Sequence, residues 1–196
     1  MEGFILAGGR SRRFGEDKLL YTIGHKRLIE CTVDALRGLC HRICLVTKDV
    51  KKFSFLEGVE LIEDFLEKQC ALSGIHTALR NLKNTKGLIV AGDMPLIRKN
   101  LLETLIQKAE PPLTLFRIGG KLQPLLAVYY KELLPYVEAY ITSGGERLVD
   151  FVEKAVHKEL DEKDASESDP ELLSFLNVNT KEDAEFILKT YGREGF

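Results

Sequence analysis

The chain contains 196 residues, of which 44% are hydrophobic and 30% are charged. A chain of this length forms one α/β domain of ordinary size or two very small ones, and a single core buries more surface. The 28 lysines and arginines nearly balance the 30 aspartates and glutamates, which gives a net charge of −2. This balance argues against a protein that coats nucleic acid or an anionic membrane, because such proteins are usually basic overall.

The sequence carries no sign of export or of membrane insertion. The apolar run at residues 4–7 is far shorter than the core of a secretory signal, and no basic segment precedes it. No apolar stretch approaches the roughly 20 residues that cross a bilayer. The cysteines form no Cys-x-x-Cys pair and no dense disulfide framework. We therefore expect a cytoplasmic protein in which Cys31, Cys40, Cys44 and Cys70 are structural; a metal-binding fragment around Cys40-His41 is the alternative.

Short apolar runs alternate with helical periodicities from the first residue to about residue 110. The runs predict strands at residues 3–7, 43–46, 59–62 and 87–91. The periodicities predict helices at residues 28–39, 75–82 and 100–109, the second of them capped by Ser73. Alternation of strand and helix is typical of a mostly parallel sheet with helices on both faces.

The pattern changes after Pro111-Pro112. Residues 113–118 and 122–130 are predicted strands joined across Gly119-Gly120, a dipeptide that suits a tight hairpin turn. Pro124 within the second strand indicates an edge position or a bulge. Helices are predicted at residues 131–141, 146–155 and 181–191. Residues 159–171 carry seven acidic side chains against one lysine, which predicts a solvated, mobile loop.

The most informative segment is the glycine-rich run at residues 6–18, Leu-Ala-Gly-Gly-Arg-Ser-Arg-Arg-Phe-Gly-Glu-Asp-Lys. It directly follows a buried strand, which places it at the carboxyl edge of a parallel sheet, where α/β proteins bind ligands. Glycines let backbone N–H groups approach an anion, and four basic residues outnumber two acidic ones. The spacing excludes the P-loop and the Gly-x-Gly-x-x-Gly dinucleotide fingerprint. A polyphosphate site is the favoured interpretation, and an ordinary basic surface loop is the alternative.

Further landmarks follow in order: Glu63-Asp64, Ala91-Gly92-Asp93-Met94-Pro95-Leu96, Gln123-Pro124-Leu125 and Asn177-Val178-Asn179-Thr180. With the glycine-rich run, they resemble the nucleotidyltransferases, and most of all the molybdenum cofactor guanylyltransferase family. This resemblance implies a Rossmann-like α/β fold in one domain, 1–196. It also implies a nucleotide-binding half, 1–110, with the mostly parallel sheet, and an acceptor-binding half, 111–196, with the antiparallel hairpin.

The resemblance also implies roles for individual residues. Arg13, Lys18 and Asp93 would be catalytic: the two basic side chains neutralise phosphates, and Asp93 binds Mg²⁺, the expected cofactor. Backbone amides of Ala7, Gly8 and Gly9 would cradle the phosphates. The full predicted nucleotide-binding set is Leu6, Ala7, Gly8, Gly9, Gly15, Lys18, Asp64 and Asp93. An Asp93 that caps the following turn and an Asp64 that serves as a plain loop carboxylate are the alternatives.

The predicted acceptor-binding residues lie in the second half. They are Gln123, Arg147, Asn177 and Asn179. The two asparagines alternate along an extended segment, so their amides point the same way and can each donate and accept. The alternative is that this segment forms the N-cap of the last helix, with Thr180 and Asp183 in a capping box.

The implied reaction is transfer of GMP from GTP to the terminal phosphate of molybdenum-molybdopterin, with release of pyrophosphate. Partners known through the family are a GTP-binding accessory protein and molybdoenzyme acceptors; neither nucleic acid nor membrane is expected. Two departures lie where the base is read: Thr47 replaces an asparagine, and Cys70-Ala71-Leu72-Ser73-Gly74 replaces Gly-Pro-Leu-Ala-Gly. A cytidylyltransferase acting on molybdopterin or on a sugar or polyol phosphate therefore stays open, as does a non-catalytic nucleotide-binding subunit.

Overall fold

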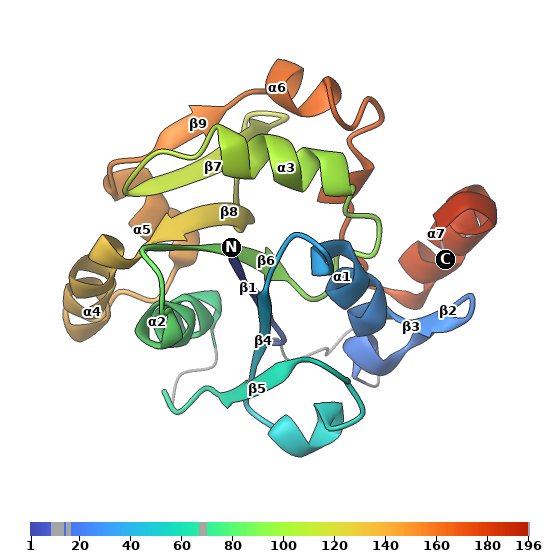
Figure 1. Cartoon of the computed structure of the whole chain (residues 1–196), viewed down its shortest axis with the longest axis horizontal. Helices are drawn as coiled ribbons and strands as arrows, with labels where there is room; N and C mark the ends of the chain where they lie inside the picture. The colour runs from blue at the N-terminus through green and yellow to red at the C-terminus, as the bar shows by residue number, and fades with distance from the viewer. Residues whose placement is uncertain (9–13, 15–16, 67–69, 196) are drawn as a thin grey trace.

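The computed structural model describes residues 1–8, 14, 17–66 and 70–195. Its centre is a seven-stranded sheet with the order β5-β4-β1-β6-β8-β7-β9 (Figure 1). The strands are β1 (Glu2–Leu6), β4 (Arg42–Thr47), β5 (Glu60–Glu63), β6 (Lys86–Ala91), β7 (Leu113–Ile118), β8 (Lys121–Tyr130) and β9 (Lys158–Leu160). A separate antiparallel pair consists of β2 (Thr22–Ile23) and β3 (Lys26–Arg27).

The sheet is mostly parallel, as predicted. Strand β1 lies between β4 and β6, and all three run in the same direction. Strand β8 runs antiparallel to both of its neighbours, β6 and β7. The predicted hairpin is confirmed, because β7 and β8 are joined by Gly119 (φ 55°) and Gly120 (φ 73°). Two successive positive φ angles define the tight turn whose twist matches antiparallel strands.

Strand β8 is not an edge strand, but its pairing with β6 ends at Leu126, so Pro124 lies beyond that pairing. It also lies at an irregularity in the pairing with β7. The pairing of β8 with β7 passes from Leu115–Ala127 to Arg117–Leu122, so the register shifts around the proline. A bulge leaves a residue unpaired, and proline has no N–H to pair. The bulge half of the prediction is therefore confirmed.

Helices cover both faces of the sheet. They are α1 (Leu28–Leu36), α2 (Ala71–Asn81), α3 (Lys99–Gln107), α4 (Leu134–Thr142), α5 (Leu148–Lys154), α6 (Glu162–Ser166) and α7 (Lys181–Gly195), with 3₁₀ turns η1 (Lys18–Leu20), η2 (Val50–Phe53), η3 (Lys131–Leu133) and η4 (Leu173–Phe175). Helices α1, α3, α6 and α7 contribute to one core, and α2, α4 and α5 contribute to the other.

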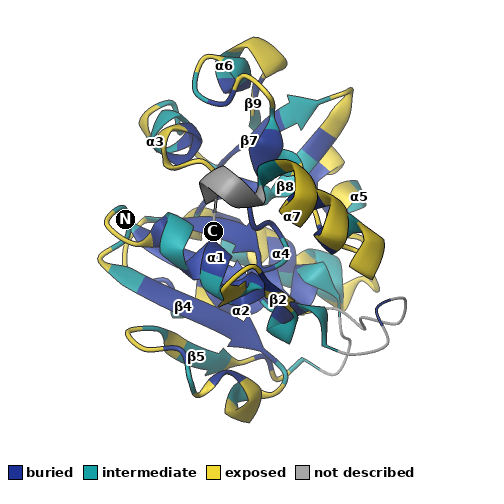
Figure 2. Ribbon diagram, turned by 90° about the vertical axis from the view of Figure 1, so that its right-hand side faces the viewer, coloured by how far each residue is buried: buried dark blue, intermediate teal, exposed yellow. Residues whose placement is uncertain are grey.

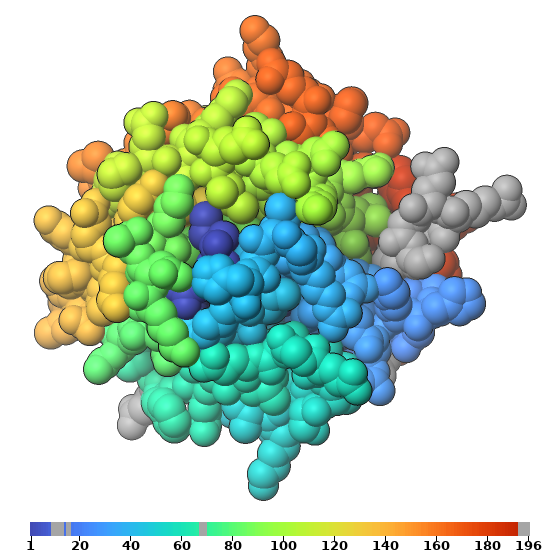
Figure 3. All heavy atoms as spheres, in the orientation of Figure 1, coloured from blue at the N-terminus to red at the C-terminus, as the bar shows by residue number. Residues whose placement is uncertain are grey.

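Side chains alternate between the two cores along each strand. On β1, Ile5 packs in the core beside α1, whereas Phe4 and Leu6 pack in the core beside α2. Figure 2 shows β4 mostly buried, while α7 turns an exposed face outward. In the space-filling view, atoms of later segments surround a small patch of the N-terminal strand (Figure 3). The strand that leads into the glycine-rich run thus lies buried at the centre of the sheet.

Two predicted helix boundaries are wrong for local reasons. Helix α1 ends at Leu36, not at residue 39, because Gly38 takes a φ of 79° that a continuing helix cannot use. Helix α2 begins at Ala71, so Ser73 lies inside its first turn and is not the N-cap. The Ser73 hydroxyl donates to the carboxylate of Asp64, a partner nine residues away in the chain.

The acidic segment 159–171 is ordered, so the prediction of a mobile loop is wrong. It contains part of β9 and all of α6. Its acids have partners that are distant in sequence: Arg117 of β7 forms two bonds to Glu159, and Lys108 lies 2.5 Å from Asp164. Arg117 and His157 lower the pKa of Glu159 to about 2. Charge density along the chain does not reveal cations supplied from elsewhere in the fold.

Two further acids of this segment hold the backbone. The Asp161 carboxylate accepts from the N–H of Asp164 at 2.9 Å and caps α6. Asp169 is only 1% exposed and accepts from the N–H of Ser174 at 2.8 Å. No helix among the described residues has the length and apolar character needed to cross a membrane.

Candidate active site

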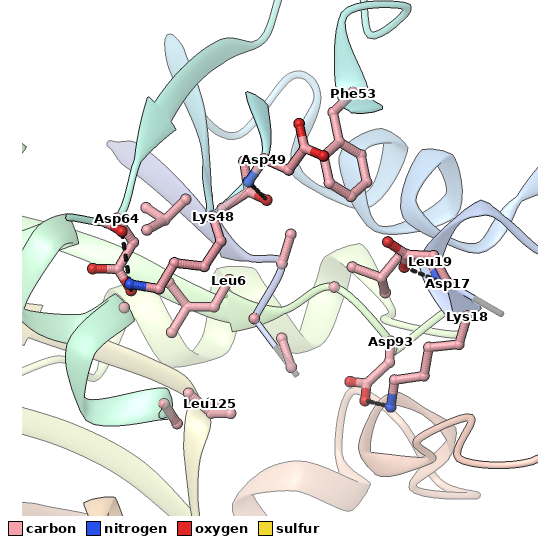
Figure 4. A pocket seen from close by; sticks show the side chains of 18 of the residues that line it. Leu6, Asp17, Lys18, Leu19, Lys48, Asp49, Phe53, Asp64, Asp93 and Leu125 are labelled. Carbon is pink, nitrogen blue, oxygen red and sulfur yellow. Dashed lines mark hydrogen bonds and ion pairs between the residues drawn. The ribbon is translucent and has the colours of Figure 1, made fainter. Parts of the chain in front are cut away.

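A cavity of about 190 Å³ lies at the carboxyl ends of the parallel strands β1, β4, β5 and β6 (Figure 4). Each strand delivers a different group to its wall. Leu6 ends β1, and Ala7 and Gly8 follow it. Lys48 and Asp49 follow β4, Asp64 follows β5, and Gly92 and Asp93 follow β6. The structure therefore brings described residues of the glycine-rich run together with Asp64 and Asp93, as the order of elements predicts.

Lys18 and Asp93 form an ion pair in this cavity. The Lys18 Nζ atom lies 2.5 Å from Asp93 Oδ2. It also donates to the Val178 carbonyl at 3.1 Å and to Asn179 Oδ1 at 3.3 Å. Lys18 is placed by the turn η1, whose preceding residue Asp17 accepts from the N–H of Leu19. The 3₁₀ turn η1, capped by Asp17, thus directs the Lys18 side chain toward Asp93.

The backbone around Asp93 is held from several sides. The Asp93 carbonyl accepts from the N–H of Val178 at 2.9 Å. The Thr32 hydroxyl lies within hydrogen-bonding distance of the Gly92 and Met94 carbonyls, at 3.2 and 3.4 Å. A Cβ on Gly92 would come within 3.1 Å of a side chain of α1, so glycine permits this close packing. The Asp93 carboxylate is therefore presented from a rigid turn.

One oxygen of Asp93 has no hydrogen-bond partner among the described residues. Within the part of the chain that the structure describes, Asp93 Oδ1 is buried and accepts no hydrogen bond. Buried polar atoms are almost always paired, so such an orphan acceptor needs an explanation. Carboxylate oxygens are the ligands that Mg²⁺ takes in proteins. The carboxylate of Asp93 is therefore a chemically suitable ligand for the predicted Mg²⁺ ion.

Asp64 occupies the opposite end of the cavity and is only 8% exposed. Its carboxylate accepts from the hydroxyls of Ser73 at 2.5 Å and Thr77 at 2.9 Å, and from the N–H of Leu66 at 3.3 Å. Lys48 Nζ lies 3.3 Å from the same carboxylate. Four donors converge on its two oxygens, so Asp64 is a well-anchored group. Its role as a nucleotide contact stays a prediction.

Lys48 forms hydrogen bonds with the backbone that follows β5. Its ammonium group donates to the carbonyls of Asp64, at 2.7 Å, and of Leu66. It thereby joins the end of β4 to the segment after β5. Sequence reasoning missed Lys48, although a basic residue directly after a predicted parallel strand is a usable signal. It also missed Thr77 and assigned Ser73 to a helix cap, because the roles of both depend on the distant Asp64.

The glycine-rich run is only partly described. Arg13, Gly9 and Gly15 lie outside the described residues. The Ala7 N–H donates to the Val46 carbonyl at 2.8 Å, so this amide is used by the sheet and not by a phosphate as predicted. Gly8 lines the cavity, and a Cβ at this position would meet nothing within 4 Å among the described atoms.

Phe14 of this run has a buried side chain. Its side chain is 3% exposed and packs edge-on against Tyr21, with 5.1 Å between ring centroids. Lys181, at the start of α7, lies over both rings. Phe14 is thus packed against Tyr21 and beside the first residue of the C-terminal helix.

The predicted acceptor residues divide into two groups. Gln123, Arg147 and Asn177 line a second hollow, and Asn177 also lines the first cavity. Asn179 instead accepts from Lys18. The alternative capping role is also present, because the Thr180 hydroxyl accepts from the N–H of Asp183 and the Asp183 carboxylate accepts from the N–H of Thr180. The segment therefore both starts α7 and reaches Lys18.

Comparisons with known proteins find relatives along nearly the whole chain. The family model described as the MobA-like NTP transferase domain matches residues 3–159. A probable molybdenum cofactor guanylyltransferase of Aquifex aeolicus is 34% identical over 187 residues, covering 94% of this chain and 89% of that protein. A protein of the same description from Pyrococcus furiosus is 36% identical over 201 residues, covering 98% of each. The crystal structure of molybdopterin-guanine dinucleotide biosynthesis protein A from Archaeoglobus fulgidus superposes with a TM-score of 0.85 at 26% identity, covering 98% of this chain and 100% of that one.

Proposed function

The chain belongs to the MobA-like NTP transferase family, and on that premise we propose that it is a molybdenum cofactor guanylyltransferase. The reaction is transfer of GMP from GTP to the terminal phosphate of molybdenum-molybdopterin. The observation that carries the proposal is the pairing of Lys18 with Asp93 in a cavity at the carboxyl edge of the sheet. Full-length relatives that carry this name support the choice of substrates.

The chemistry needs alignment and charge neutralisation more than a general base. An oxygen of the molybdopterin phosphate attacks the α-phosphorus of GTP, and the bond from that phosphorus to the β-phosphate oxygen breaks. Pyrophosphate leaves with the electron pair of the broken bond. A phosphate monoester has a second pKa of about 6, so the attacking oxygen is already anionic at neutral pH. In-line displacement then depends on positioned cationic groups.

The side chains of the cavity suit these requirements. Lys18 supplies a positive charge for the triphosphate and the leaving pyrophosphate, and Gly8 lies where the chain can approach phosphate closely. Mg²⁺, when bound at Asp93, would neutralise and orient phosphate oxygens. The second hollow, which adjoins the first through Asn177, is the proposed position of the acceptor, with Gln123 and Arg147 in its wall.

A pyrophosphate-release assay tests the proposal. Purified protein is incubated with Mg²⁺ and GTP, CTP or ATP, with and without molybdopterin. Release is expected with GTP only when the acceptor is present, and release that is faster with CTP would contradict the choice of base. Lys18→Ala and Asp93→Ala should each slow release at least about tenfold, as loss of a positioned charged group does. Lys158→Ala is the matched control, because Lys158 pairs with Glu110 outside both cavities.

A further inference from the structure

The ammonium group of Lys18 lies at the centre of a small cluster of oxygen atoms. Asp93 Oδ2, the Val178 carbonyl and Asn179 Oδ1 lie 2.5, 3.1 and 3.3 Å from Lys18 Nζ. The oxygens come from the end of β6 and from the segment before α7, which the hydrogen bond between the Val178 N–H and the Asp93 carbonyl holds together. The fold has thus built a site for a cation, and the chain's own lysine occupies it.

The same oxygens suit a divalent cation. A carboxylate, a backbone carbonyl and an amide carbonyl are all hard oxygen ligands of the kind that Mg²⁺ and Mn²⁺ bind. Asp93 brings a further coordinating atom, because its buried Oδ1 accepts no hydrogen bond from the described residues. An unpaired buried acceptor beside an occupied one points to a ligand that binds more of the carboxylate than Lys18 does.

A divalent cation at Asp93 and an ammonium group 2.5 Å from the same carboxylate would repel each other strongly. We infer that Lys18 and a divalent cation compete for this oxygen cluster, so the ligand-free protein keeps Asp93 on its own lysine and takes up the cation only together with the nucleoside triphosphate. The inference rests on the proposed function, since the triphosphate is the anion that draws Lys18 away from Asp93.

This exchange gives the Lys18 ammonium a different anionic partner in each state. In the ligand-free protein Lys18 compensates the partly buried carboxylate of Asp93, whose charge would otherwise destabilise the fold. In the complex, Lys18 pairs with phosphate and the cation compensates Asp93. Positive charge therefore faces Asp93 in both states. The free cation is excluded until the substrate that needs it has arrived.

Binding of Mn²⁺ without nucleotide tests the competition. The full-length wild type and Lys18→Met are titrated with Mn²⁺, and free Mn²⁺ is followed by electron paramagnetic resonance. We expect Lys18→Met, which keeps the length of the side chain and removes its charge, to bind Mn²⁺ at least about tenfold more tightly. Lys52→Met is the matched control: Lys52 lines the same cavity but lies 3.4 Å from Asp17, so its loss should leave Mn²⁺ affinity unchanged.

A double variant assigns the gain to one carboxylate. Lys18→Met with Asp93→Asn should lose the added affinity, whereas a gain that persists places the ion on another acid and overturns the inference. Equal affinity of Lys18→Met and wild type also overturns it, and so does tight binding by the wild type. Lys18→Gln, checked for folding by circular dichroism, replaces the methionine variant if that one fails to fold. No GTP or molybdopterin enters this titration, so its failure leaves the pyrophosphate-release test of the proposed function intact.

Discussion

Replacing Asp64 by alanine should destabilise the fold substantially, because two buried hydroxyls would lose their acceptor. Ser73 is 1% exposed and Thr77 is 7% exposed, and both donate to the Asp64 carboxylate. A buried polar group left without a partner costs about 1–3 kcal/mol, so two such groups give an expected loss of about 2–6 kcal/mol. Lys48 should add little, since its ammonium keeps two backbone carbonyls.

A double-mutant cycle isolates the interaction from other effects of the substitution. Asp64→Asn keeps the shape and one acceptor oxygen, and Ser73→Ala removes one donor. Because the two side chains are in direct contact, we expect a coupling energy of about 0.5–3 kcal/mol between these substitutions. Urea denaturation followed by far-ultraviolet circular dichroism gives the free energies of unfolding. Additivity within about 0.5 kcal/mol would refute the argument that this bond anchors the cavity wall.

The same variants examine the predicted nucleotide contact of Asp64. If the carboxylate also reads the base, Asp64→Asn should weaken GTP binding more than Ser73→Ala does when the two are compared under conditions in which both are folded. Equal thermal shifts on addition of GTP would assign Asp64 to the architecture of the cavity alone. The comparison works because both variants disturb the same hydrogen bond, whereas only one changes the carboxylate.

Three further predictions concern stability and are measured by urea denaturation. Burial alone would raise the pKa of Glu2, but hydrogen bonds from two backbone N–H groups and from Arg42 outweigh burial and lower the pKa below 4.5. The stability that ionised Glu2 contributes is therefore present above pH 4.5 and is lost as the pH falls through the lowered pKa. Glu2→Gln should make the free energy of unfolding depend less on pH in this acidic range. Asp169→Ala should cost about 1–3 kcal/mol, whereas the exposed Glu171→Ala should stay within about 0.5 kcal/mol of wild type, and equal effects would contradict the ordered structure of the acidic segment. A Cβ on Gly3 would come within 2.6 Å of a leucine carbon in α1, so Gly3→Ala should cost about 1–3 kcal/mol; an unchanged midpoint would show that α1 adjusts freely.

Local patterns were enough to predict the sheet and the position of the cavity. The apolar run before Ala7 is buried because β1 is a central strand, and Gly119-Gly120 forms the turn whose backbone angles its residues favour. Parallel strands bring their carboxyl ends to one edge, so Asp64 and Asp93 had to lie on the same side as the glycine-rich run. These inferences depend only on neighbours in the chain and on strand direction.

Partners that are distant in sequence could not be predicted in the same way. The acidic segment was misinterpreted because Arg117 and Lys108, which compensate Glu159 and Asp164, belong to β7 and to the turn after α3. Similarly, nothing near Lys18 in the sequence indicates that its ammonium reaches the Val178 carbonyl. A hydrogen-bond partner depends on the packing of whole elements, whereas periodicity reports only which face of one element is buried.

Two of the cavity's carboxylates, Asp64 and Asp93, differ in how fully the protein satisfies their oxygens. Asp64 accepts from two hydroxyls and one amide and has Lys48 beside it, so a ligand that used its oxygens would have to displace a donor already in place. Asp93 has Lys18 on one oxygen and accepts nothing on the other from the described residues. A group that binds a cation reversibly needs an acceptor that the protein has not already satisfied. Of the two, only Asp93 meets that condition, and Asp64 is suited to hold the wall against which the nucleotide would lie.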